Sequence, residues 1–444
     1  MTMRSVVRFD EALQRAIEVA RARLADFAAK TVIVRDLNGR IRIALDDRGL
    51  PPAPEATWRE TIAAELTAAL DAYAVPKSSA VLLATQMMEP DELFSDEGCV
   101  PVAGGPEWLS ISEKTITGSD WVRSPLPDPG GLRLALFGAK GGVGRTTAAT
   151  LLAWQLSEIG KRVLIVDLDL ESPGVASVLL APDQAGDFGV VDWLVEDAVG
   201  QSAGLMGEMI VSSTLETRSP GRGAIHVLPA AGRERSGYEY IPKLSRAYLD
   251  VRDAQEHVQD LATRVGRMLS EAEASIAPDI TILDSRAGIH DLAAIALTRL
   301  NATSLLFAVD SPQTWRAYEL LFRQWQSVSS RTKDVRERLK MVASSVPESA
   351  TSAYLDRFVQ HSYACFAKHV YEEAVPGDMD AFNYDLHDSD APHSPLRIPW
   401  SRTFMQFDPI GNPGGITSDQ IDATYGEFVR GVHTLVFAKE WPPS

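Results

Sequence analysis

Residues 138–147 read Gly-Ala-Lys-Gly-Gly-Val-Gly-Arg-Thr-Thr, and they lie between an apolar run at 132–137 and a helical pattern. Glycines at 141, 142 and 144 let the backbone turn tightly and bring its N–H groups close to phosphate oxygens. A helix that begins near Thr146 adds its positive N-terminal end at the same point. A strand, such a loop and a helix in this order predict a nucleotide site in an α/β fold.

The loop departs from the usual phosphate-loop pattern G-x-x-x-x-G-K-[ST]. Ala139 occupies the position of the first glycine, Gly138 lies one residue too early, Arg145 replaces the usual lysine, and Lys140 is an additional lysine. Arginine keeps the positive charge, but it is a planar fork where lysine is a compact point charge. We therefore expect nucleotide binding with slow hydrolysis.

Two further apolar runs end in aspartate. Residues 162–166 lead into Asp167-Leu-Asp169-Leu-Glu171, and residues 280–283 lead into Asp284-Ser-Arg-Ala-Gly288. Because an open α/β sheet binds ligands at the carboxyl ends of its strands, these carboxylates are expected beside the loop. With the Thr146 hydroxyl, they predict a Mg²⁺ site. Two interpretations of Arg286 stay open, a phosphate contact and an ion-pair partner.

Together these blocks resemble the deviant Walker A ATPases, the group that contains the ParA and MinD proteins. Residues 140–147, KGGVGRTT, match KGGxGK[ST][ST] except at Arg145, which resembles a branch labelled by its KGGVGR motif. Residues 167–170 look like the second acidic motif, and 284–288 like D-[ST]-x-[AP]-G. Residues 228–230, Leu-Pro-Ala, resemble the end of a family strand. The resemblance covers roughly residues 130–440.

The resemblance implies a role for each matching residue. Lys140 would reach across an ATP-dependent dimer to the partner's nucleotide, and Asp169 would orient the attacking water. With Lys140 and Asp169, Arg145 completes the candidate catalytic set. Thr146, Asp167 and Asp284 would support Mg²⁺. ATP or ADP would be held by the loop and by the main-chain N–H of Gly288, the candidate binding residues being Gly141, Gly142, Val143, Gly144, Arg145, Thr146, Thr147 and Gly288.

Length and composition predict a two-domain globular protein. The chain has 444 residues, 45% hydrophobic residues and two cysteines, which favours a reducing, cytoplasmic setting without a disulfide framework. No apolar run is long enough for a transmembrane helix. The net charge of −17 argues against non-specific DNA binding without excluding a local basic patch.

We expect a small α/β or α+β module at 1–125, a linker at 126–131, and a doubly wound, mostly parallel ATPase domain at 132–444. The module reads as α-β-β-α-β, with a hairpin at Asn38-Gly39. In the second domain, strands are expected at 132–137, 162–167, 224–229, 279–284, 304–309, 340–345 and 395–399. Helices are expected at 146–159, 250–273, 312–327, 351–372 and 418–438, with a loop over 200–223.

Two segments suggest at first a metal site and a membrane-binding helix, but their residues do not support either interpretation. His387, Asp388, Asp390 and His393 lie in a polar excursion at 374–394, but their spacing matches no standard metal site, so a plain loop is favoured. The terminal segment 425–437 carries little positive charge, whereas membrane-surface helices have a basic polar face. A packed terminal helix is therefore expected.

The leading hypothesis is a homodimer switch that ATP closes and that controls a protein partner. A nucleotide-binding scaffold without useful hydrolysis is the alternative that Arg145 suggests. A DNA-partitioning ATPase is disfavoured by the acidic charge. From the resemblance alone, proteins with KGGVGR look like components of multi-gene bacterial systems, such as defence against phage.

Overall fold

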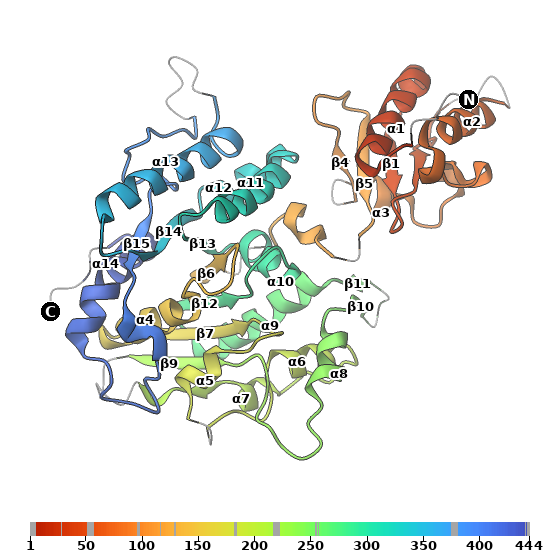
Figure 1. The fold of residues 1–444 in the computed structure, drawn as a ribbon. Coiled ribbons are helices and arrows are strands. Elements are labelled where there is room, and N and C mark those ends of the chain that lie inside the picture. Colours follow the sequence, from red (N-terminus) through yellow and green to blue (C-terminus); the bar gives the residue numbers. More distant parts are fainter. Residues whose placement is uncertain are drawn as a thin grey trace. The chain divides into compact units, whose positions relative to one another are not determined.

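The computed structural model describes residues 6–27, 29–50, 57–95, 98–115, 117–127, 130–181, 184–215, 223–253, 255, 257–373, 381–439 and 441. The chain divides into two compact units, Met1–Ser119 and Asp120–Ser444 (Figure 1).

The first unit is built on a mixed sheet with strand order β3-β2-β1-β5-β4. Its strands are β1 (Thr31–Arg35), β2 (Ile41–Leu45), β3 (Val81–Leu83), β4 (Val100–Pro101) and β5 (Leu109–Glu113), and its helices are α1 (Phe9–Leu24), α2 (Trp58–Leu70) and α3 (Pro90–Phe94). The strand β1 pairs antiparallel with β2, as the hairpin signal predicts, and parallel with β5. Apolar side chains of α1 and α2 pack with β1 and β2 in one core.

The second unit contains a sheet of order β15-β14-β13-β6-β12-β7-β9-β8. Its strands are β6 (Arg133–Gly138), β7 (Arg162–Leu168), β8 (Val211–Ser212), β9 (Ala224–Leu228), β12 (Ile280–Ser285), β13 (Thr303–Ala308), β14 (Leu339–Val346) and β15 (Leu396–Pro399). All its neighbouring strands are parallel except the edge strand β8, which runs antiparallel to β9. The predicted doubly wound, mostly parallel sheet is thus confirmed. Strand β6, which leads into the glycine-rich loop, lies between β13 and β12.

Helices cover both faces of this sheet because its strands are apolar on both sides (Figure 1). Ala135 and Phe137 of β6 face one core, and their neighbours Leu134 and Leu136 face the other. The helices are α4 (Arg145–Glu158), α5 (Val175–Leu179), α6 (Val190–Asp197), α7 (Met206–Met209), α8 (Tyr240–Ala247), α9 (Leu261–Ile276), α10 (Asp291–Ala294), α11 (Pro312–Gln326), α12 (Ser329–Arg336), α13 (Thr351–His369) and α14 (Ser418–Phe437).

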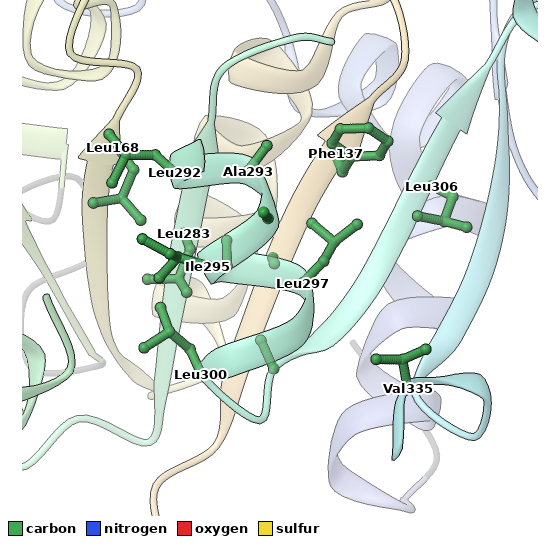
Figure 2. Close-up of a cluster of buried hydrophobic side chains, with 14 of the residues drawn as sticks. Phe137, Leu168, Leu283, Leu292, Ala293, Ile295, Leu297, Leu300, Leu306 and Val335 are labelled. Carbon is green, nitrogen blue, oxygen red and sulfur yellow. The ribbon is translucent and has the colours of Figure 1, made fainter. Parts of the chain in front are cut away.

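The first of these cores fixes the segment that follows the second acidic strand. Figure 2 shows Phe137, Leu168, Leu283 and Leu306 of four neighbouring strands beside Leu292, Ala293, Ile295, Leu297 and Leu300. Leu292 and Ala293 belong to α10, Ile295 and Leu297 to the π-helical segment Ile295–Arg299 that continues it, and Leu300 caps that segment. Burial of these side chains holds the carboxyl ends of β6, β7 and β12 side by side.

The helix predicted over 250–273 is wrong over residues 250–260. Residues Val251–Arg252 (β10) and Val258–Gln259 (β11) form a small antiparallel pair, and α9 begins only at Leu261. The Asp253 carboxylate accepts hydrogen bonds from the main-chain N–H groups of Gln255 and His257, both at 2.9 Å. That turn competes with helix formation. The expected loop over 200–223 contains α7 and β8, and residues 216–222 lie outside the described part.

The second unit begins before the predicted linker, because Asp120 and its neighbours pack within it. The Arg299 Nη1 atom lies 2.8 Å from Asp120 Oδ1, and both side chains are about nine-tenths buried. Thr298 donates from Oγ1 to the Asp120 carbonyl at 2.7 Å. Leu126 donates its N–H to the Arg299 carbonyl at 2.8 Å. Of the predicted linker 126–131, residues 128 and 129 lie outside the described part.

The terminal helix packs as the sequence predicts. In α14, the side chains of Ile421, Tyr425, Phe428, Val429 and Val432 are buried against the second core. Within the described residues, no helix combines the length and apolar character that a bilayer crossing needs.

The polar segment predicted at 374–394 contains a buried histidine and is therefore not a plain surface loop over its described residues, 381–394. The His393 ring is buried, with Nδ1 2.5 Å from the Tyr371 hydroxyl and Nε2 3.0 Å from the Leu386 carbonyl. Across the described residues, no three His, Cys, Asp or Glu side chains gather as metal ligands. Residues 374–380 of the excursion lie outside the described part.

Candidate nucleotide and metal site

The loop between β6 and α4 has the backbone that its glycines predict. Gly142 and Gly144 have φ angles of 73° and 77°, in the left-handed region that glycine adopts without strain. Gly138 lies at a close approach of the chain. A Cβ atom there would lie 3.0 Å from the Lys140 carbonyl oxygen and 3.2 Å from Arg145 Cδ. The early glycine therefore makes room for the arginine side chain.

The remaining loop residues form the surface and the first turn of the site. Gly141 is exposed, Val143 is buried in the second core, and Thr147 is half-buried near the start of α4. They lie where the sequence predicts them, between the strand end and the helix N-terminus.

The Thr146 hydroxyl and the Asp284 carboxylate meet at the base of the loop. Thr146 Oγ1 donates to Asp284 Oδ2 at 2.6 Å, although the two residues are far apart in sequence. The other oxygen, Asp284 Oδ1, is buried and has no hydrogen-bond partner among the described residues. Burial raises the pKa of Asp284 to about 6, while the Thr146 hydrogen bond and the Arg145 charge act in the opposite direction.

Asp167 lies beside Asp284, because these two residues are register partners on β7 and β12. Its carboxylate accepts main-chain N–H groups from Asp169 at 3.1 Å, Gly174 at 2.9 Å and Val175 at 3.1 Å. Burial, and then the charge of Asp284, raise the pKa of Asp167 to about 7. Asp167 thus shapes the loop after β7, and Asp284 holds the oxygen that is left without a partner.

Asp169 is half-buried at the start of that loop. Its Oδ1 atom accepts the main-chain N–H of Ser172 at 3.2 Å. Burial raises the pKa of Asp169, and the Arg145 charge opposes that shift. A carboxylate that burial makes more basic and that keeps partial access to solvent suits the handling of a water proton.

Arg145 is buried, and its Nη1 donates to the main-chain carbonyl of Ser285. Its charge acts on Asp169 and Asp284, so it is the cation between the two acidic strand ends. Lys140 instead is exposed, and its Nζ bonds to Gln313 Oε1 at the start of α11.

Gly288 has a different partner from the one the sequence predicts. Its N–H donates to the Gly138 carbonyl at 2.9 Å, and its φ angle is 88°. In this structure the N–H is therefore engaged with the phosphate loop, because the segment after β12 lies against the end of β6. Contact with a terminal phosphate requires this hydrogen bond to open.

Arg286 forms an ion pair, one of the interpretations that the sequence left open, but sequence reasoning missed Glu171 as its partner and did not anticipate Tyr248 and His290. Glu171 accepts a hydrogen bond from the Tyr248 hydroxyl at 2.5 Å, and it lies 3.2 Å from His290 Nε2 and 3.3 Å from Arg286 Nη1. The available signal was a third acid in the Asp167–Glu171 run followed by basic residues after Asp284. Its partners are distant in sequence, so only the fold brings them together.

Mg²⁺ fits the residues present. It is usually held by one or two carboxylates together with water and substrate phosphates, not by a complete protein cage. Asp284 Oδ1 is an oxygen without a partner, the Thr146 hydroxyl is adjacent to it, and Arg145 limits the negative charge.

A parallel sheet with a glycine loop between its central strand and the next helix, and with an acid at the neighbouring strand end, defines a P-loop nucleotide-binding domain. Residues 133–212 match the family model described as "AAA domain". The second unit therefore has the P-loop arrangement of strand, glycine loop and helix, and its residues 133–212 are similar in sequence to that family.

Three relatives illustrate the likeness. The chain is 62% identical over 37 residues to the chromosome-partitioning ATPase Soj of Thermus thermophilus, and that match spans 8% of this chain but only 15% of the relative. The structure of pNOB8 ParA bound to nonspecific DNA is 14% identical, with a TM-score of 0.43, covering 69% of this chain and 98% of that one. Cobyrinic acid a,c-diamide synthase from Mycobacterium smegmatis, with bound ADP and magnesium, is 17% identical, with a TM-score of 0.40, covering 71% and 99%.

Proposed function

We propose that this chain binds ATP with Mg²⁺, hydrolyses it slowly, and uses the ATP-bound state to pair with a second copy and control a protein partner. The observation that carries the proposal is the pairing of Thr146 with Asp284, which leaves one buried carboxylate oxygen open at the base of the phosphate loop.

Each candidate residue has a task in this proposal. The loop N–H groups and the α4 N-terminus bind the phosphates, and Arg145 adds positive charge. Thr146 and Asp284 hold Mg²⁺, which supplies charge neutralisation on the phosphates when bound. Asp169 orients the attacking water and receives its proton. Asp167 keeps the Asp169 loop in place through its three main-chain hydrogen bonds.

Dimerisation is assigned to Lys140. Its side chain is exposed and, within the part of the chain that the structure describes, is held by an exposed hydrogen bond to Gln313, which it can leave at small cost. A second copy that carries bound ATP offers the lysine a phosphate charge, which ADP lacks at the terminal position.

The test is solution mass by light scattering with Mg²⁺ and ATP, with Mg²⁺ and ADP, and without nucleotide. We expect a doubled mass with ATP alone, lost in Lys140→Ala and kept in Lys333→Ala, a matched exposed lysine on α12. A mass that is the same in all three conditions would refute the switch.

The second candidate is a nucleotide-binding scaffold without useful turnover. It is favoured by the Arg145–Ser285 contact, which ties the loop cation to the main chain. Nucleotide retained through purification, with no phosphate released over hours, would support the scaffold over the switch.

A further inference from the structure

Glu171 connects three segments around the site. Its Oε1 atom lies 2.5 Å from the Tyr248 hydroxyl and 3.2 Å from His290 Nε2, while Oε2 lies 3.3 Å from Arg286 Nη1. The Tyr248 and His290 rings also pack edge to face, with centroids 5.6 Å apart. One carboxylate therefore ties the loop after β7 to the segment after β12 and to the residue that follows α8.

Arg286 is close enough to act on both this carboxylate and Asp169 of the candidate nucleotide site. It is two residues beyond Asp284 and two before Gly288, on the segment that contacts the phosphate loop through Gly288 and Gly138. Its charge also reaches Asp169, whose pKa it lowers against the larger effect of burial. The side chain is about 40% exposed, so it has room to change partner.

We propose that Glu171 is a positioning residue that holds Arg286 away from the nucleotide until a terminal phosphate is present, and that this exchange sets the preference for ATP over ADP. The proposal rests on the proposed nucleotide function and assigns the regulation of that same site. It joins the two interpretations of Arg286, since the ion pair is the state without nucleotide and the phosphate contact is the state with ATP.

The exchange leaves Glu171 partly paired, because only the buried Oε2 atom, which has no hydrogen-bond partner among the described residues, gives up its ion pair with Arg286. When Arg286 leaves, the carboxylate keeps the Tyr248 hydroxyl and His290 as partners. A guanidinium binds a phosphate with the same planar fork that it offers to a carboxylate. The same movement opens the Gly288–Gly138 hydrogen bond, which frees the Gly288 N–H for the phosphate as well.

The test compares the affinities of a non-hydrolysable ATP analogue and of ADP, with Mg²⁺, by fluorescence titration. In Glu171→Gln the carboxylate charge that retains Arg286 is gone. We expect analogue binding to tighten by about two- to fivefold, the scale of an exposed ion pair, with ADP binding unchanged. Glu208→Gln, an exposed carboxylate on α7, is the matched control and should change neither affinity.

Arg286→Ala and its combination with Glu171→Gln distinguish a role of Glu171 in positioning Arg286 from a general structural role of Glu171. Arg286→Ala should weaken the analogue towards the affinity of ADP, and Glu171→Gln should have no further effect in that background. An equal change for both nucleotides, or an effect of Glu171→Gln that persists without Arg286, would overturn the inference alone. Wild-type protein that binds neither nucleotide would instead overturn the proposed function.

Discussion

Arg145 donates a hydrogen bond from Nη1 to the main-chain carbonyl of Ser285, at the end of the strand that carries Asp284. The residue that replaces the usual loop lysine is thus part of the internal structure of the site. A guanidinium held in this way can still attract the negative charge of a bound phosphate. Its hydrogen bond to the main chain limits how far it can move when the phosphate changes position during the reaction.

Turnover is accordingly expected to be slow, below the roughly 1 s⁻¹ at the low end of typical enzymes. Arg145→Lys should raise it by about tenfold, since a flexible ammonium can approach the reacting phosphate and positioning dominates this chemistry. Phosphate release under saturating ATP measures both. Rapid wild-type hydrolysis that Asp169→Ala abolishes would contradict the expectation.

Asp169→Asn should reduce phosphate release by about 10²- to 10⁴-fold, because the amide cannot accept the proton of the attacking water. ATP affinity should stay within twofold, as measured by titration with the non-hydrolysable analogue. Asp250→Asn, at an exposed position after α8, serves as the control. Unchanged turnover in Asp169→Asn would assign the proton to another group.

The acidic pair predicts a pH dependence of stability in the metal-free protein. The pKa values of Asp167 and Asp284, about 7 and about 6, lie above the ordinary aspartate value near 4. The folded state keeps these protons where the unfolded chain has lost them, so the free energy of unfolding should fall as pH rises from about 4 to about 7.

Asp284→Asn tests this assignment, because it removes one of the two neighbouring charges. Urea unfolding in EDTA should show a smaller loss of stability between pH 5 and pH 8 than in the wild type. The same variant should lose the Mg²⁺ dependence of nucleotide binding. A variant with the wild-type pH slope would show that the carboxylates do not interact.

Gly138→Ala tests the close approach below the loop. The added methyl group would press on the Lys140 carbonyl and on Arg145, so we expect a loss of about 1–3 kcal/mol in stability and weaker nucleotide binding. Gly414→Ala is the matched control, because its Cβ would meet no atom within 4 Å and the residue lies outside the loop. Equal effects of the two changes would refute the steric explanation.

Asp120→Ala should destabilise the second unit by about 3 kcal/mol, the low end for breaking a buried pair, since Arg299 keeps Asp260 at 3.6 Å. Arg123→Ala removes a more exposed partner of Asp260 and should cost under about 1 kcal/mol. Chemical unfolding measures the free energy of unfolding of both variants and of the wild type. Similar costs would mean that burial does not strengthen the Asp120 contact.

The sequence predicts the sheet and the loop well, because continuous apolar strands and glycine spacing are local signals. It misses β5 (Leu109–Glu113), whose two serines, Ser110 and Ser112, are buried in the sheet. It also misses the turn at Asp253, where side-chain hydrogen bonds override helix propensity.

At the site, Asp167, Asp169 and Asp284 can be predicted from their positions at or just after strand ends, and Thr146 from its place at the start of the helix after the glycine loop. The partners of Glu171, Gly288 and Arg145 do not, since each lies on a segment distant in sequence. Three-dimensional packing determines which Asp284 oxygen already accepts a hydrogen bond, and it determines that the Gly288 N–H already donates one. Those contacts decide how the site would change between nucleotide states.

The contacts of Asp120 and Leu126 also determine where the chain can be cut. A shortened protein beginning at Leu132 would lack the acid that neutralises Arg299, and it would remove Trp121 from the core. It would also leave the Arg299 carbonyl and the Asn301 amide without their contacts to Leu126. The smallest version of the second unit worth purifying therefore starts at or before Asp120, within the residues that the sequence assigns to the preceding module.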